Sequence, residues 1–370
     1  MNRNEKSKLK SDLAAALLHW FAANARDLPW RRTSDPYAIW VSEIMLQQTQ
    51  VKTVIPYWER WLHELPTVQS LAAASPDKIH KLWEGLGYYT RVRNMHKAAQ
   101  KIVAGHQGTF PCRFENILEL PGIGRYTAGA ISSIAFNEPR PILDGNVIRV
   151  LTRLFGIEAN PREKVTNGQL WCLAAELVTA AAKMESNGKA RNACSHLNQS
   201  LMELGALICI PRQPKCAACP MRKHCTAFRT GRVEHLPNLG PRVIATARHF
   251  TAFVIEHRGR VLVRQRPAGV VNAHLWEFPN IEMPDGLKPA LAAKTPFGFP
   301  LTGLEELYTI KHSITRYRIT LKAFRAAIKP GQARKAARQG SWLSLAELHS
   351  LAFTSAHRRI LQRLTNQPNA

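Results

Sequence analysis

Hydrophobic residues recur every three or four positions through most of residues 11–225, and this period predicts a run of helices. Breaks at proline and glycine, such as PGIG at 121–124, separate one expected helix from the next. Near the N-terminus, four apolar side chains share one helical stripe behind the expected N-cap Ser11: Leu13, Leu17, Trp20 and Phe21. We interpret this stripe as a packed helix rather than as the apolar stretch of a signal peptide.

From about residue 246 the hydrophobic period changes to two, which predicts strands. FTAFVIE and VLVRQRP flank residues 257–260 as an expected hairpin, and residues 316–323 alternate basic with apolar side chains. Helical patterns return in SLAELHSLA and AHRRILQRL. Between the two halves, residues 226–245 lose periodicity and gain Gly, Pro and Arg, as linkers do. We therefore expect an all-α region over 1–225, a linker over 226–245 and an α+β domain over 246–365.

One apolar segment, VSEIMLQQTQV at 41–51, contains a single carboxylate and several glutamines. At helical spacing Glu43, Gln47 and Gln50 share one face. A solvated surface is one interpretation, but such surfaces usually mix Lys and Glu in ion pairs. Uncharged amides beside a lone acid are more typical of a wet pocket, so we expect Glu43 to line one.

The charge balance changes the functional picture. The 370 residues include 51 Lys and Arg against 26 Asp and Glu, a net charge of +25. Such an excess predicts a polyanionic partner, because contacts to phosphates release condensed counterions. Nucleic acid is the first candidate. A membrane is not expected, since we find neither a span-length apolar run nor a basic amphipathic helix with a broad apolar face.

Four of the seven cysteines are crowded into one short segment with the spacing C-x6-C-x2-C-x5-C: Cys209, Cys216, Cys219 and Cys225. An odd total and this crowding favour metal ligands in a reducing cytoplasm over a disulfide framework. Only one pair has the C-x2-C spacing that structural zinc sites usually show twice. A [4Fe-4S] cluster is therefore the favoured interpretation, with zinc and unliganded thiols as the alternatives.

Two helical patterns in ILELPGIGRYTAGAISSIAF (117–136) are joined by a glycine turn. Gly122 and Gly124 permit tight turning, and the second helix would begin with exposed amide donors beside Arg125. This arrangement predicts a phosphate cradle, although a plain helix-turn-helix corner has the same pattern.

Asp144 in PILDGNVIRV precedes an apolar helical run. Aspartate is a preferred N-cap and needs no other role. A capping carboxylate also accepts amide hydrogen bonds that favour its ionised form, so we expect a fixed negative charge here at neutral pH.

Together with GLGYYTRVRN (85–94) and the cysteine loop, these motifs resemble the helix-hairpin-helix DNA glycosylases of the endonuclease III-like superfamily, most closely the MutY family of adenine glycosylases. The resemblance covers nearly the whole chain. It implies a six-helix barrel over 28–140, an iron-sulfur cluster domain formed by 1–27 plus 141–225, and a Nudix-like domain over 246–365. The implied activity is base excision repair: a monomer, nucleoid-associated if bacterial, that releases adenine opposite 8-oxoguanine or guanine in double-stranded DNA.

The resemblance also implies roles for individual residues. Glu43 would protonate the purine at N7 while Asp144 stabilises the sugar cation. Four side chains would line the base pocket: Trp30, Arg31, Gln48 and Gln199. For Trp30 a core position is an equally good interpretation, and for Arg31 the alternative is a phosphate contact. Tyr88 would wedge into the base stack, with a buried core position as its alternative.

Three departures from related patterns bear on the activity. Related glycosylase/lyases have a Schiff-base lysine after the Gly-Arg of the hairpin, where this chain has Tyr126, which implies hydrolysis without strand cleavage. Residues 277–300 lack the glutamate-rich run that holds Mg²⁺ in Nudix hydrolases, which implies recognition without hydrolysis. The family's Phe-Ser-His lesion-reading loop corresponds here to Ile314-Thr315-Arg316, so Thr315 and Arg316 are the candidate lesion readers.

Two other functions remain as alternatives. One is a bifunctional glycosylase/lyase that acts on oxidised pyrimidines. The other is a non-catalytic DNA-binding protein that uses its cluster as a redox sensor, for which Glu43 and Asp144 would be dispensable.

Overall fold

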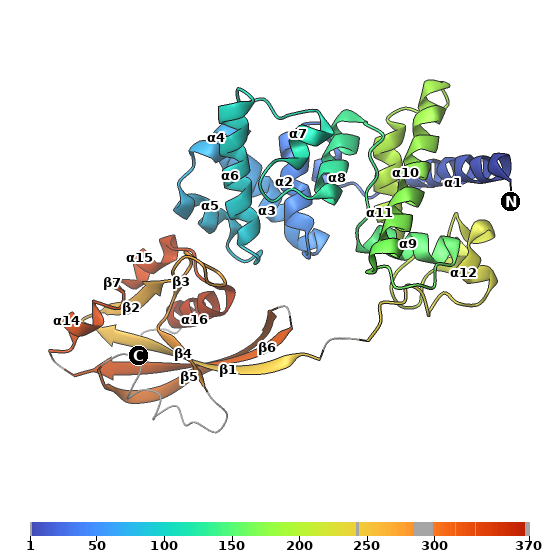
Figure 1. Ribbon diagram of the computed structural model, residues 1–370. Helices are drawn as coiled ribbons and strands as arrows, with labels where there is room; N and C mark the ends of the chain where they lie inside the picture. Colours follow the sequence, from blue (N-terminus) through green and yellow to red (C-terminus); the bar gives the residue numbers. More distant parts are fainter. Residues whose placement is uncertain (1, 242–243, 284–298, 315, 330, 367–370) are drawn as a thin grey trace. The chain divides into compact units, whose positions relative to one another are not determined.

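The computed structural model describes residues 2–241, 244–283, 299–314, 316–329 and 331–366 (Figure 1). The chain divides into two compact units, Met1–Ala73 with Asn94–Arg242 and Ala74–Arg93 with Val243–Ala370. The first unit is helical, and the second combines a sheet with helices. These boundaries differ from the predicted ones in two places: residues 74–93 group with the C-terminal unit, and the helical unit continues past residue 225.

The helical unit opens with α1 (Arg3–Asn24), which begins at the N-cap Asn2 through a capping box with Glu5. The predicted N-cap Ser11 is wrong, because it lies inside this helix. The predicted apolar stripe is buried, with Leu13 and Leu17 fully inaccessible. The next elements are η1 (Pro29–Arg31), α2 (Pro36–Leu46), α3 (Val51–Glu64), α4 (Val68–Ala73), α6 (Thr90–Gly105), which continues from the other unit, α7 (Phe114–Leu118) and α8 (Arg125–Phe136).

The remaining helices of this unit are α9 (Gly145–Phe155), α10 (Lys164–Ser186), α11 (Ala193–Leu207) and α12 (Thr226–Arg229), with the short turns η2 (Cys216–Ala218) and η3 (Arg222–His224). α1, α9, α10 and α11 share one apolar core. Gly205 lets α11 approach α9 closely, because a Cβ there would lie 2.6 Å from the Cβ of Asn146. α2 packs against α8 (Figure 1). These contacts bring the end of α2 and the start of α9 near the same stretch of α11.

The segment 41–51 is not one helix. α2 ends at Leu46, Gln48 has a left-handed backbone (φ 57°), and Gln50 caps the start of α3. The expectation that Glu43, Gln47 and Gln50 share a helical face is therefore wrong. No glycine or proline marks this break in the sequence, and for that reason the pattern does not reveal it.

The predicted linker is partly wrong as well. Its first residues form α12, which packs on α9 and buries Ala227 completely. Further along, Leu236 is 3% exposed, and its carbonyl accepts a hydrogen bond of 2.8 Å from Nε of Arg153. This stretch belongs to the packed helical unit rather than to a free connection.

The second unit holds a mixed sheet in the order β3-β2-β1-β6-β5, with β4 beside β1 and β7 beside β2. β1 and β6 run parallel, and the other pairs of named strands run antiparallel. The strands are β1 (Thr246–His257), β2 (Arg260–Gln265), β3 (Trp276–Glu277), β4 (Asn280–Met283), β5 (Leu301–Ile314), β6 (Tyr317–Ile328) and β7 (Ser341–Leu343). The predicted hairpin is confirmed, with Arg258 and Gly259 at positive φ between β1 and β2.

Apolar side chains cover both faces of this sheet. One face packs with residues of α15 (Leu345–Ser350) and α16 (Ser355–Asn366), which confirms the two predicted C-terminal helices. The other face packs with Phe299 and α14 (Ala333–Ala336). The unit also includes α5 (Pro76–Trp83). The predicted mixed α and β character of this part of the chain is confirmed.

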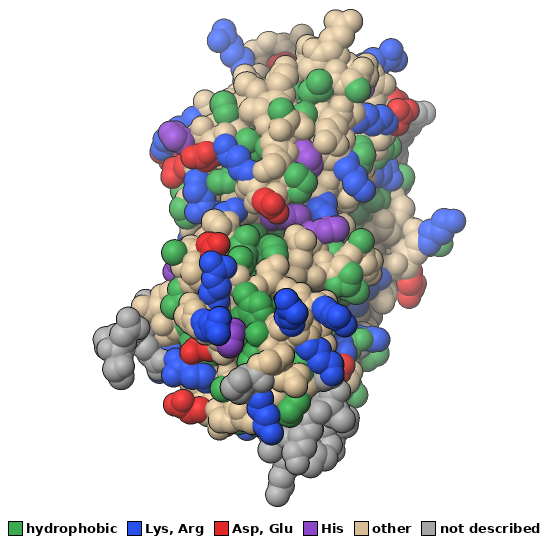
Figure 2. Space-filling view, turned by 90° about the vertical axis from the view of Figure 1, so that its left-hand side faces the viewer, with side chains coloured by type: hydrophobic (Ala, Val, Ile, Leu, Met, Phe, Trp, Pro, Cys, Tyr) green, Lys and Arg blue, Asp and Glu red, His purple; other side chains and the backbone are tan. Residues whose placement is uncertain are grey.

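Lys and Arg side chains are spread over the face drawn in Figure 2, with fewer acidic ones among them, as the net charge of +25 requires. Within the described residues, none of the helices combines the length and the apolar character needed to cross a membrane.

Candidate active site

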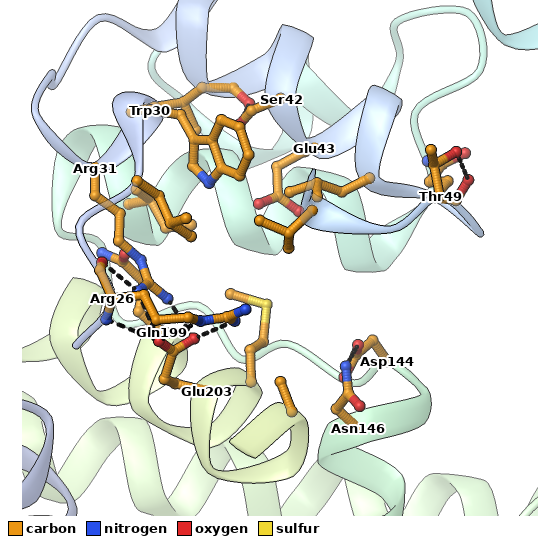
Figure 3. A pocket seen from close by; sticks show the side chains of 18 of the residues that line it. Arg26, Trp30, Arg31, Ser42, Glu43, Thr49, Asp144, Asn146, Gln199 and Glu203 are labelled. Carbon is orange, nitrogen blue, oxygen red and sulfur yellow. Dashed lines mark hydrogen bonds and ion pairs between the residues drawn. The ribbon is translucent and has the colours of Figure 1, made fainter. Parts of the chain in front are cut away.

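A cavity of about 530 Å³ lies in the helical unit, between η1, the end of α2, and the facing parts of α9 and α11 (Figure 3). Its volume falls within the range of roughly 300–1,000 Å³ typical of small-molecule sites. Seven of the predicted site residues line it: Trp30, Arg31, Glu43, Gln48, Tyr126, Asp144 and Gln199. These residues are far apart in the sequence, from Trp30 to Gln199, and the fold brings them together around one cavity.

Glu43 is a buried carboxyl group in the wall of this cavity, with 5% of its surface exposed. Burial raises its pKa to about 7, and the nearby negative charge of Asp144 adds to the rise. The hydroxyl of Tyr126 donates to Oε2 of Glu43 at 2.9 Å, and this bond and the charge of Arg31 act in the opposite direction. Glu43 thus lines a pocket, and burial shifts its pKa in the expected direction, while its role as the acid stays a prediction.

Asp144 is the N-cap of α9, as predicted, and its Oδ1 accepts the amide N–H of Val147 at 2.8 Å. Oδ2 accepts from Nδ2 of Asn146 at 3.1 Å, and Oδ1 of Asn146 in turn accepts from Nη2 of Arg149 at 2.8 Å. Burial raises the pKa of Asp144 above its ordinary value, and these hydrogen bonds oppose the rise. The amide bonds expected to keep it ionised are present, but burial outweighs them.

The cavity wall near Glu43 is built from aromatic and amide side chains. Trp30 is 7% exposed and meets the ring of Trp58 edge to face, so it is both core and lining. Nε2 of Gln199 donates to Oγ of Ser195 at 3.1 Å, which fixes the amide from behind. Gln48 lies on the exposed rim.

A further acid, Glu203 on α11, lines the same cavity and is not among the residues predicted from the sequence. Its side chain is 1% exposed and accepts hydrogen bonds from both Arg26 and Arg31 (Figure 3). Burial alone would raise the pKa of Glu203, but the two arginines lower it to about 2. No local motif reveals this residue, because its partners lie more than 170 positions away along the chain.

The glycine hairpin lies outside the cavity lining. Gly122 has φ of 78°, and a Cβ there would meet Asn94 at 2.6 Å, so both conformation and space require glycine. Gly124 caps α8, and no side-chain hydrogen bond caps this helix start. Arg125, the first residue of α8, stacks its guanidinium over the ring of Trp171 at 4.0 Å. Gly124 and Arg125 are exposed at this helix start, and the phosphate cradle stays a prediction.

Tyr88 belongs to the second unit and does not line the cavity. It has φ of 48° and is 46% exposed, so the alternative that it is buried core is wrong. Arg91 lies against its ring at 5.6 Å and donates to the carbonyls of Leu86 and Gly87. Tyr88 is therefore an exposed aromatic residue in a loop that hydrogen bonds from Arg91 stabilise.

Of the two candidate lesion readers, Thr315 lies outside the described residues. Arg316 is exposed in the turn between β5 and β6, where Ile314 pairs with Tyr317. Its guanidinium lies over the Tyr317 ring at 5.2 Å and donates to the phenol oxygen. Arg316 therefore lies in the turn between two strands, and the role of both residues as lesion readers stays a prediction.

The four cysteines Cys209, Cys216, Cys219 and Cys225 line one small cavity. Nη1 of the buried Arg153 lies 3.4 Å from Sγ of Cys209. Across the described residues, no group of three or more His, Cys, Asp or Glu side chains converges closely enough to hold a single metal ion. Four cysteine sulfurs around one cavity form a donor set of the kind that iron-sulfur clusters use.

Comparisons with known proteins agree with this geometry. Residues 41–176 match the model of the HhH-GPD superfamily base excision DNA repair protein, and residues 251–363 match that of the NUDIX domain. The structure of a thermostable thymine-DNA glycosylase is 28% identical, with a TM-score of 0.53 over 61% of this chain and 98% of that chain. The fold and the site thus define a base excision DNA repair protein of the HhH-GPD superfamily followed by a Nudix-like domain.

Curated relatives narrow the assignment. An adenine DNA glycosylase of Rattus norvegicus is 34% identical over 94% of this chain and 76% of its own length. One of Arabidopsis thaliana is 38% identical over 76% of this chain, which spans about half (48%) of that longer relative. The chain belongs to the family of adenine DNA glycosylases.

Proposed function

We propose that this protein is a monofunctional DNA glycosylase of base excision repair. It removes adenine mispaired with 8-oxoguanine or guanine by hydrolysing the N-glycosidic bond of a nucleotide turned out of the duplex. The observation that carries the proposal is one cavity that holds a buried acid with a pKa of about 7, Glu43, and the carboxylate of Asp144, in a chain of this family.

Glu43 acts as the general acid. Cleavage of the bond between C1′ and the purine nitrogen moves its electron pair onto adenine, a poor leaving group as an anion. With a pKa of about 7, Glu43 carries a proton in a large fraction of molecules near neutral pH. Transfer of that proton to N7 lets adenine leave neutral, and water then adds to C1′ and loses a proton.

Asp144 stabilises the sugar, which becomes positively charged as the bond breaks. Its position is fixed by the amide of Val147 and the side chain of Asn146, so little reorganisation is needed during reaction. At a separation of about 4 Å and an effective dielectric near 20, an opposite charge is worth about 4 kcal/mol. That energy corresponds to roughly three decades in rate.

The lining side chains recognise the base. Gln48 and Gln199 each offer a donor and an acceptor, as the edge of adenine requires, and Trp30 provides an aromatic wall. Outside the cavity, the amides at Gly122, Gly124 and Arg125 contact phosphates. Tyr88 wedges into the stack, and Thr315 and Arg316 contact the opposite base.

Tyr126 favours hydrolysis over strand cleavage. A lyase needs an amine near C1′, whereas the side chain at this position is a phenol hydrogen-bonded to Glu43. A purely regulatory DNA-binding protein has no need for a buried, protonated acid beside a second carboxylate. The alternatives drawn from the sequence thus lack support from the site.

We also propose that Cys209, Cys216, Cys219 and Cys225 hold a [4Fe-4S] cluster. A bound cluster would tie together the loop that follows α11, and Arg153 would place positive charge beside it. We assign to the cluster a contribution to stability, and to the residues of the larger cavity the cleavage of the bond itself.

A strand-cleavage assay tests the proposed function. Duplexes with adenine opposite 8-oxoguanine, guanine, cytosine or thymine are incubated with the protein, with and without alkali. Breaks that require alkali and are confined to the first two duplexes are expected. Breaks without alkali would indicate a lyase, and the absence of any breaks would reject the proposal.

A further inference from the structure

Glu203 presents one buried carboxylate to two arginines in the wall of the proposed active site. Its Oε1 accepts from the backbone N–H of Arg26 at 2.9 Å, from Nε of Arg26 at 2.8 Å and from Nη1 of Arg31 at 3.0 Å. Its Oε2 accepts from Nη2 of Arg26 at 2.6 Å and from Nη2 of Arg31 at 3.0 Å. Both guanidinium groups are therefore held through two-point contacts.

These contacts fix the orientation of Arg31. Besides Glu203, its Nη1 donates to the carbonyl of Arg26 at 3.0 Å, and its guanidinium lies 5.2 Å from the centre of the Phe21 ring. A guanidinium has five N–H donors. Within the described residues, hydrogen bonds use both donors of Nη1 and one of Nη2, so Nε–H and one Nη2–H are left for a ligand in the cavity.

The same contacts set the local charge. One carboxylate against two guanidiniums leaves a net single positive charge, whereas loss of the carboxylate would leave two. The charged and titratable groups that act on Glu43 are Tyr126 from α8, Asp144 from the start of α9, and Arg31 from η1. Because Arg31 lowers the pKa of Glu43, a change in the net charge around Arg31 should also change that pKa.

We propose that Glu203 is a positioning residue for adenine release: it aims Arg31 into the cavity and offsets the positive charge that Arg31 brings towards Glu43. The inference rests on the proposed function. A merely structural ion cluster would affect the stability of the fold but would not move the pH dependence of catalysis.

The test is the pH profile of single-turnover adenine release with enzyme in excess, using an adenine:8-oxoguanine duplex. Because the general acid is active when protonated, the fall in rate at high pH reports its pKa. Glu203→Gln adds net positive charge and frees Arg31. We expect a rate about ten- to a hundred-fold lower at pH 7, and a high-pH limb about 0.5–1 unit lower than in wild type.

Arg26→Gln is the second variant, and it keeps the test decisive if Glu203→Gln fails to fold. It removes one positive charge while the carboxylate still holds Arg31, so the high-pH limb should move upward. Glu277→Gln is the matched control. Glu277 is a buried carboxylate, 3% exposed, that also pairs with two arginines, Arg264 and Arg266, but it does not line the cavity. Glu277→Gln should lower the melting temperature without changing the pH at which the rate falls.

The role of Glu203 would be overturned if the high-pH fall in rate stayed at the wild-type pH in both folded variants. It would also be overturned if Glu277→Gln produced the same shift in that pH. Absence of adenine release by the wild-type protein would instead reject the proposed function, so the two failures are distinguishable.

Discussion

At the scale of single residues, one cavity holds two carboxyl groups, Glu43 and Asp144, to which we assign different roles. Glu43 is almost completely buried and accepts a hydrogen bond from the neutral hydroxyl of Tyr126, so burial dominates and raises its pKa to about 7. Asp144 sits at a helix start, where amide donors and Asn146 oppose the effect of burial. Burial raises the pKa of both groups, but Asp144 accepts more hydrogen bonds than Glu43, and we propose that this difference in surroundings sets their roles.

Replacement of Asp144 by asparagine tests its charge. Asparagine is also a good N-cap, so the melting temperature should change little. Loss of the charge should lower the single-turnover rate by about two to four decades. A loss below ten-fold would reduce Asp144 to a helix cap.

Replacement of Tyr126 by phenylalanine tests the pKa of Glu43. The Tyr126 hydroxyl lowers the pKa of Glu43, so its removal should raise that pKa. Because protonated Glu43 is the active form, activity would then persist to higher pH. The pH profile of single-turnover release measures this shift, and a limb that stays in place or moves to lower pH would contradict the assigned acid.

At the scale of elements, strong periodicity and local signals in the sequence predict the hairpin at 257–260 and the N-cap Asp144 correctly. Local patterns do not predict the features that tertiary contacts decide. The end of α2 at Leu46 has no Gly or Pro signal, and α12 is held by packing on α9 rather than by its own pattern. Glu203 was missed because its meaning depends on Arg26 and Arg31, which only the fold brings near.

The start of α8 carries Tyr126, the residue that we propose separates hydrolysis from strand cleavage. Tyr126 lies one residue into this helix, with its hydroxyl beside Glu43. Tyr126→Lys would place an amine there and should permit some covalent chemistry with the sugar, detected as a borohydride-trapped complex with DNA. If no complex forms, the geometry of the site rather than the residue type at position 126 decides between hydrolysis and strand cleavage.

At the scale of the whole molecule, the net charge of +25 and the buried site predict different responses to salt. Phosphate contacts release counterions, so duplex affinity should fall by about 100-fold or more between 50 and 200 mM salt. The single-turnover rate at saturating enzyme should change by less than about three-fold, because buried charges are poorly screened. Titrations at several salt concentrations measure both, and salt-independent binding would contradict the electrostatic account.

The most direct test of the central claim is single-turnover adenine release by Glu43→Gln, compared with wild type and with the exposed-carboxylate control Glu163→Gln. Glutamine keeps the shape of the side chain but cannot supply the proton. We predict that adenine release from an adenine:8-oxoguanine duplex falls by at least about three decades while duplex affinity stays within a few-fold of wild type. Release by Glu43→Gln at a rate close to that of the control would contradict the assignment of Glu43 as the general acid.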